Sequence, residues 1–163
     1  MPSRQDEFER LAMPHLGGLL GFARRLTRDQ AAAEDLVQET MLNAWHAFPR
    51  LRDGSNVHAW LFRILLNAFH AHGRKLRSAP QIVPLAEIQD RGREECCLAN
   101  DIAEAVERLS EEHRTVLWLG VVEGFTCREM SEILGAPIGT IMSRISRARA
   151  SLRAQFVAAA KGA

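Results

Sequence analysis

The stretch "SAPQIVPLAEIQDRGREE" at positions 78–95 constrains the fold of this chain more than any other feature. It contains two prolines, a glycine and charges of both signs, and it has no core of its own. On either side of it apolar residues recur at three- and four-residue steps, and no stretch alternates as a strand does. The sequence therefore predicts an all-α protein with two small helical domains, 5–76 and 97–158, joined by a flexible linker at 77–96.

Three helices are expected in the first domain. The periodicity predicts one helix over 6–27, a second that Asp29 caps and that runs to about residue 48, and a third over 57–75. The composition of "PRLRDGSN" predicts a loop between the last two. The residues expected to pack inward are Phe8, Leu11, Leu19, Phe22, Leu26, Trp45, Trp60, Ile64 and Leu65.

A helix-turn-helix is expected in the second domain. Thr126 and Glu129 have the spacing of a capping box, in which each side chain hydrogen-bonds the backbone N–H of the other residue. Gly135 suits the left-handed end of the helix that begins there, and Pro137 suits the first turn of the next helix. A short helix, a glycine turn and a second helix make the helix-turn-helix pattern.

From residue 137 onward the chain carries five basic residues and no acidic one, although its net charge is only +1. Small polar residues and arginines would let this helix approach a DNA groove closely and contact phosphates. We therefore expect the helix to enter the major groove, the alternative being a basic helix that only faces solvent. An apolar arc of about 80° is expected to face the core and holds Ile141, Ile145, Ala148, Leu152 and Phe156.

The composition argues against a membrane protein, an enzyme and a metalloprotein. No run of eighteen apolar residues is present and "MPSRQDEFERL" lacks the apolar core of a signal peptide, so a cytoplasmic location is expected. Cys96, Cys97 and Cys127 are expected to be reduced thiols. His70 and His72 would lie on different sides of a helix, and clustered metal ligands and a nucleophile–base set are lacking. No metal and no cofactor are predicted.

Three segments, in this order, resemble the extracytoplasmic-function (ECF) sigma factors of bacterial RNA polymerase. "EDLVQETMLNAWHAF" resembles the helix that this family docks on the clamp helices of the polymerase β′ subunit. "AWLFRILLNAFHAHGRK" resembles the segment that melts and reads the minus-ten element. "LSEEHRTVLWLGVVEGFTCREMSEILGAPIGTIMSRISRARASLR" resembles the reader of the minus-thirty-five element. The resemblance implies a sigma factor whose partners are core RNA polymerase, through the β′ clamp helices and the β flap, and promoter DNA.

An acidic stripe in the first of these segments is the expected polymerase-binding face. Between residues 29 and 49 there are four acids and no Lys or Arg. Such a stripe is often a solvated face, and the resemblance is what favours a partner. Its members recur at three- and four-residue steps and are Asp35, Gln38, Glu39 and Leu42.

The resemblance also implies two sets of DNA contacts. In the family, an Asn at the position of Asn67 helps to hold a base that has flipped out of the duplex, and a side-chain amide offers the donor and the acceptor that this needs. The loop at 49–57 would form the rest of that pocket. The minus-ten set is Leu51, Asn56, Arg63, Asn67, His70, Arg74 and Lys75, and the minus-thirty-five set is Thr140, Met142, Ser143, Arg144, Ser146, Arg147 and Arg149.

Two residues depart from the pattern of the family. Leu51 stands where some relatives carry an aromatic residue, and Met142 stands where relatives usually carry Lys or Arg. The stretch "DGSNVHAWLFRILLN" resembles subgroups that answer to stress-responsive anti-sigma factors, so an anti-sigma partner is expected. Two rival functions are a stand-alone helix-turn-helix regulator, which would leave the acidic stripe and Asn67 unused, and a sigma mimic, which should lack the basic helix.

Overall fold

The computed structural model describes the backbone of residues 3–52, 54–78 and 97–161, and their side chains except those of 75–78, 97–100 and 159–161. The chain divides into two compact units, 1–88 and 89–163, which are described separately. All the regular structure in the described residues is helical, which confirms the expected all-α, two-domain class. The expected linker lies almost wholly outside the described residues, so the domain boundaries remain predictions.

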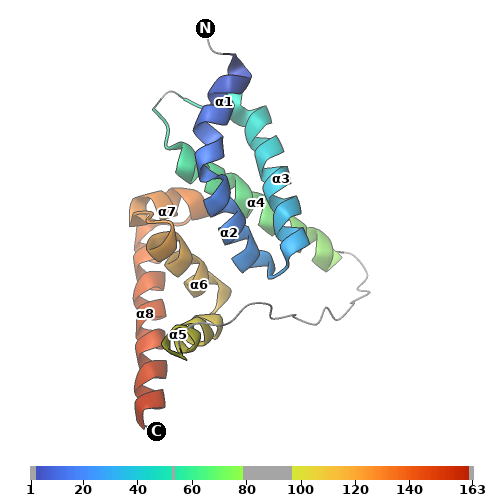
Figure 1. Ribbon diagram of the computed structural model, residues 1–163. Coiled ribbons are helices and arrows are strands. Elements are labelled where there is room, and N and C mark those ends of the chain that lie inside the picture. The colour runs from blue at the N-terminus through green and yellow to red at the C-terminus, as the bar shows by residue number, and fades with distance from the viewer. Residues whose placement is uncertain (1–2, 53, 79–96, 162–163) are drawn as a thin grey trace. The chain divides into compact units, whose positions relative to one another are not determined.

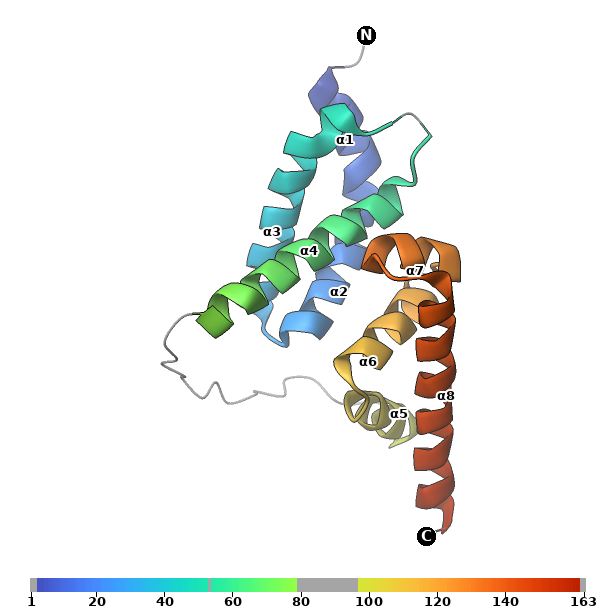
Figure 2. The same cartoon turned by 180° about the vertical axis from the view of Figure 1, so that it is seen from behind.

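The first unit is a bundle in which α2 packs on α3, and α4 crosses both (Figures 1 and 2). None of the helices in the described part of the chain is long and apolar enough to cross a membrane. The elements of this unit are α1 (Arg4–Ala12), the 3-10 turn η1 (Met13–His15), α2 (Leu16–Thr27), α3 (Gln30–Ala47), the 3-10 turn η2 (Phe48–Arg50) and α4 (Val57–Ser78).

The prediction of one continuous helix over 6–27 is wrong. The first helix begins at Arg4, where Ser3 and Asp6 form a capping box. Its α-helical hydrogen bonding ends before η1, because Pro14 has no N–H to donate to the preceding turn. At this break the His15 ring stacks on His58 of α4, with ring centroids 4.6 Å apart. Burial, followed by repulsion from His58, lowers the pKa of His15 and so favours its uncharged ring.

The core of the first unit contains four of the nine apolar residues that the sequence indicated, Phe8, Leu19, Phe22 and Leu65. Leu19, Phe22, Phe62 and Leu65 are fully buried, and the Phe22 and Phe62 rings lie 5.4 Å apart. Phe8 is buried as well, with its ring edge-on to Trp45 and to Phe48 at 5.3 Å each. The expected core residues Leu11, Leu26, Trp45, Trp60 and Ile64 are only half-buried and border this core.

The second unit contains the predicted helix-turn-helix. In the capping box the Glu129 carboxylate accepts from the Thr126 amide at 2.8 Å, and the Thr126 hydroxyl accepts from the Glu129 amide at 3.3 Å. Gly135 has φ 61°, the left-handed conformation expected of it. Pro137 immediately precedes the next helix, and its carbonyl accepts from Thr140 and Ile141. The elements are α5 (Cys97–Glu107), α6 (Glu111–Leu117), the π-helical turn η3 (Trp118–Val122), α7 (Cys127–Leu134) and α8 (Ile138–Lys161).

Helix α8 packs on α5, α6 and α7 through one face, as Figure 2 shows. Ile141 and Ala148 are fully buried on that face, and Ile145 and Leu152 are half-buried. The expectation that Phe156 also lies in the core is wrong, because it is 40% exposed. Near this end of α8 the contact with α5 is polar, since the Gln155 side chain donates to the carbonyl of Ala105 at 3.2 Å.

Candidate polymerase and nucleic-acid interfaces

The acidic stripe lies on the outer face of α3. The side chain of Asp29 caps this helix by accepting from the amide of Ala32 at 2.7 Å. Leu36, Val37, Thr40 and Ala44 are buried on the inner face. Asp35, Gln38 and Leu42 lie opposite them and are exposed, and Leu42 is 60% exposed although it is apolar. An acid, an amide and a leucine therefore share one outward-facing surface, which we call the α3 stripe.

Glu39, the fourth predicted member of the stripe, is tied to the neighbouring helix. Its Oε2 lies 2.6 Å from Nε2 of His72 on α4, and both side chains are about two-fifths exposed. Sequence reasoning did not find this partner, since the two residues belong to different helices and no spacing rule connects them. Glu39 therefore links α3 to α4 at the edge of the stripe.

The predicted minus-ten residues of α4 share one exposed face. Arg63, Asn67, His70 and Arg74 follow one another at steps of four, three and four residues, so they line up along the helix. All four are exposed, while Leu61, Phe62, Leu65 and Leu66 are buried on the other side. The side chain of Lys75 lies outside the described residues. We call these four residues the Asn67 face.

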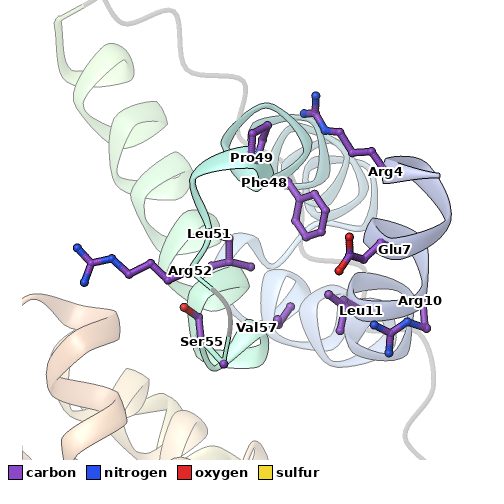
Figure 3. Close-up of a pocket in the computed structure, with 11 residues that line it drawn as sticks. Arg4, Glu7, Arg10, Leu11, Phe48, Pro49, Leu51, Arg52, Ser55 and Val57 are labelled. Carbon is purple, nitrogen blue, oxygen red and sulfur yellow. The ribbon is translucent and has the colours of Figure 1, made fainter. Parts of the chain in front are cut away.

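Next to the start of α4 is a hollow of about 500 Å³. In Figure 3 the side chains of α1 face those of the 48–57 segment across it. Leu51 lines the hollow but Asn67 does not, although the sequence assigned both residues to one base pocket. Sequence reasoning missed five of the lining residues. Four of them come from α1, and the five are Arg4, Glu7, Arg10, Leu11 and Phe48.

Two polar residues at the hollow or next to it, Asn56 and Arg4, make contacts within the protein. Asn56 caps α4, because its Oδ1 accepts from the amide of Ala59 at 3.1 Å. Arg4 donates to the carbonyl of Trp45 at 2.9 Å, and its guanidinium carbon lies 4.4 Å from the centre of the indole ring. An Asn immediately before an apolar run is a cap signal, so the role of Asn56 was readable from the sequence.

The outer face of α8 carries most of the predicted minus-thirty-five residues. Met142, Ser146, Arg147 and Arg149 are exposed, and Thr140 and Ser143 are half-buried. Arg144 is different: its Nη2 lies 3.2 Å from Oε1 of Glu112 on α6, and its side chain is only 24% exposed. Any contact of Arg144 with DNA would compete with this ion pair.

Two shallow hollows of about 380 Å³ each flank the first half of α8. One lies towards α6 and includes Glu112, Thr140 and Arg147. The other lies towards α7 and includes Cys127, Met142 and Arg149. The helix therefore stands out as a ridge between them, the shape that entering a groove requires. In the described part of the chain, no group of three or more His, Cys, Asp or Glu residues could hold a metal ion.

Two family models and several known proteins match this chain. The model of Sigma-70 region 2 matches residues 11–79, and that of Sigma-70 region 4 matches residues 99–152. The ECF RNA polymerase sigma factor EcfG of Rhodopseudomonas palustris is 33% identical over 83% of this chain and 77% of its own length. The RNA polymerase sigma-H factor of Pseudomonas aeruginosa is 29% identical over 89% of this chain and 83% of its own.

Two solved structures are similar in fold over nearly the whole chain. The sigma factor RpoE of Bartonella quintana, in complex with the anti-sigma factor NepR, has a TM-score of 0.71 and 32% identity, and the match covers 92% of this chain and 96% of that one. CnrH, in complex with the cytosolic domain of CnrY, has a TM-score of 0.68 and 29% identity, covering 94% and 90%. The chain belongs to the ECF family of sigma-70 factors. The predicted sigma function is thereby confirmed, and neither rival function is favoured.

Proposed function

We propose that the α3 stripe docks on core RNA polymerase, that the Asn67 face and the Leu51 hollow bind the opened minus-ten element, and that α8 reads the minus-thirty-five duplex. The observation that carries this proposal is that most candidate residues of α3, α4 and α8 are exposed, on faces of these helices other than those that form the buried cores. The chain acts in the cytoplasm as a non-enzymatic initiation factor.

The chemistry of the α3 stripe suits a basic protein surface. Asp35 supplies a charge, Gln38 adds hydrogen-bonding capacity, and Leu42 adds apolar area that is exposed in the free chain. Interfaces combine an apolar centre with complementary charges at the rim. The pairing of Glu39 with His72 leaves Asp35 as the acid expected to set the charge complementarity.

The Asn67 face suits a single strand of DNA. Arg63 and Arg74 lie on either side of Asn67 along the exposed face of α4 and would contact phosphates, which leaves the amide for a base edge. Asn67 lies ten residues beyond Val57, or about 15 Å along the helix. The hollow at Leu51 would therefore hold a second base of the same strand, while the Asn67 amide holds the base that has flipped out of the duplex.

An anti-sigma factor is the proposed regulator. One solved neighbour described above, the sigma factor RpoE, was captured with the anti-sigma factor NepR. By likeness to it, this chain would be held inactive by an anti-sigma protein until that protein is removed. Because the chain must exchange between this partner and polymerase, its exposed faces would be shared between the two.

The free chain is expected to bind a promoter duplex weakly, and its complex with core polymerase is expected to bind the same duplex specifically. The chain has a net charge of only +1, and its basic residues on α8 are few, so the counterion release that drives DNA binding is small. Fluorescence anisotropy at physiological salt measures both affinities. Tight, sequence-specific binding by the free chain would instead support the stand-alone regulator.

Replacing Arg147 with Ala should weaken binding of the holoenzyme to the minus-thirty-five duplex to a similar degree for every sequence. If Arg147 contacts a phosphate, the slope of log affinity against log salt should fall by about one. Arg108→Ala is the matched control, because Arg108 is exposed and already paired with Glu104 on α5. An unchanged salt slope in Arg147→Ala, or an equal change in Arg108→Ala, would remove Arg147 from the interface.

A further inference from the structure

Two apolar residues are exposed at the beginning of α8. Ile138 is 48% exposed and Met142 is 58% exposed. They are four residues apart, so they lie next to each other on one side of α8. The buried contacts of this helix are made by other residues, with Ile141 and Ala148 fully buried. The core of the unit therefore does not account for Ile138 and Met142.

The surroundings of this pair are polar and positively charged. Met142 borders the hollow of about 380 Å³ that also includes Ser146 and Arg149. Arg147 projects from the same helix, beside the hollow on its other flank. No acidic residue occurs anywhere after position 137. Exposed apolar groups beside exposed arginines fit a polyanion that presents small apolar groups at its surface better than they fit an ordinary protein partner.

We propose that Met142, supported by Ile138, reads the methyl groups of thymines in the minus-thirty-five element. Thymine is the one DNA base that displays an apolar group, its C5-methyl, in the major groove. Residues near the N-terminus of a recognition helix are those that meet base edges, and Met142 is the fifth residue of α8. An unbranched thioether adapts its shape to such a contact. The inference deepens the proposed role of α8 and rests on it.

The contact predicts a specific preference for thymine. A thymine methyl that becomes buried against Met142 loses its exposure to water, and so does the side chain. Burial of one such carbon corresponds to about a fourfold gain in affinity. Lys or Arg at this position would instead favour the acceptors of guanine. Met142 is thus a specificity-determining residue, while the arginines supply affinity that is independent of sequence.

The test uses the holoenzyme made from the full chain and core polymerase. Promoter fragments with a randomised minus-thirty-five block are first selected for binding, and each thymine in the selected block is then replaced in turn by deoxyuridine, which lacks only the methyl. With the unaltered chain, one or two replacements should weaken binding about fourfold each. In Met142→Ala the same replacements should have no effect, and in Met142→Leu the effect should return.

Val157→Ala is the matched control. Val157 is an apolar residue of the same helix and is about as exposed as Met142. It lies about 22 Å further along the helix axis. Its variant should respond to deoxyuridine as the unaltered chain does. The inference is wrong if selected blocks contain no A·T pair, if no replacement weakens binding, or if Met142→Ala retains the full thymine effect. Failure of the proposed function has a different signature, because the holoenzyme would then leave the minus-thirty-five region unprotected in a footprint.

Discussion

Replacing Asp35 with Lys is expected to weaken assembly with core RNA polymerase by roughly tenfold to a hundredfold without lowering the melting temperature. Asp35 is exposed on the outer face of α3, so folding gains little from its charge. At an interface with a basic surface, the reversed charge meets a like charge instead of an opposite one. A titration of labelled core polymerase with each variant, alongside thermal unfolding, gives both quantities.

The best control for this change is Glu34→Lys. Glu34 is an exposed acid of the same helix, one position away but outside the stripe, so the variant alters net charge by the same amount. Glu39 is a poor choice for reversal, because a Lys there would also face His72 and disturb the contact between α3 and α4. If Asp35→Lys binds core polymerase as tightly as Glu34→Lys does, the α3 stripe is only a solvated surface.

Asn67→Ala should impair opening of the minus-ten region and reduce the discrimination among minus-ten sequences by about 1–3 kcal/mol, or roughly fivefold to 150-fold. The amide lies on an exposed helix face between arginines, where it supports no core contact. Its loss should therefore leave the fold intact and remove a donor and an acceptor from the base edge. Permanganate reactivity of thymines reports strand opening, and competition among minus-ten variants reports the preference.

Asn43→Ala provides the control for Asn67, because Asn43 is an exposed amide in the same unit, on α3. It should open the promoter normally. A pre-melted promoter bubble separates the two DNA contacts, since it should bypass a defect in duplex binding such as that of Arg147→Ala. Unchanged minus-ten preference in Asn67→Ala on that bubble would show that the amide does not hold the base.

The parts of the fold that the sequence predicted well are those that local chemistry decides. Asp29, Thr126 with Glu129, and Gly135 each act on backbone groups within a few residues, so their spacing alone indicates where helices begin and end. Pro14 could have been read in the same way, as a proline inside a helical pattern, and its break in the first helix follows from the same local rule.

The features that the sequence did not predict depend on contacts between elements. The pairs Glu39–His72 and Arg144–Glu112 each join two helices, and helical periodicity says nothing about which faces meet. The contribution of α1 to the Leu51 hollow, and the absence of Asn67 from its lining, are likewise set by packing. Phe156 matched the apolar arc but is 40% exposed, because the periodicity of one helix does not show how far other helices cover it.

Run-off transcription with core polymerase tests the central claim most directly. Genomic promoter fragments are transcribed by core polymerase alone, with the chain added, and with Asp35→Lys added. Discrete transcripts should require the unaltered chain, should start at fixed positions on a subset of fragments, and should fall sharply with Asp35→Lys. If the chain binds the same fragments specifically but core polymerase produces no discrete transcript with it, the account of this protein as a working sigma factor is contradicted.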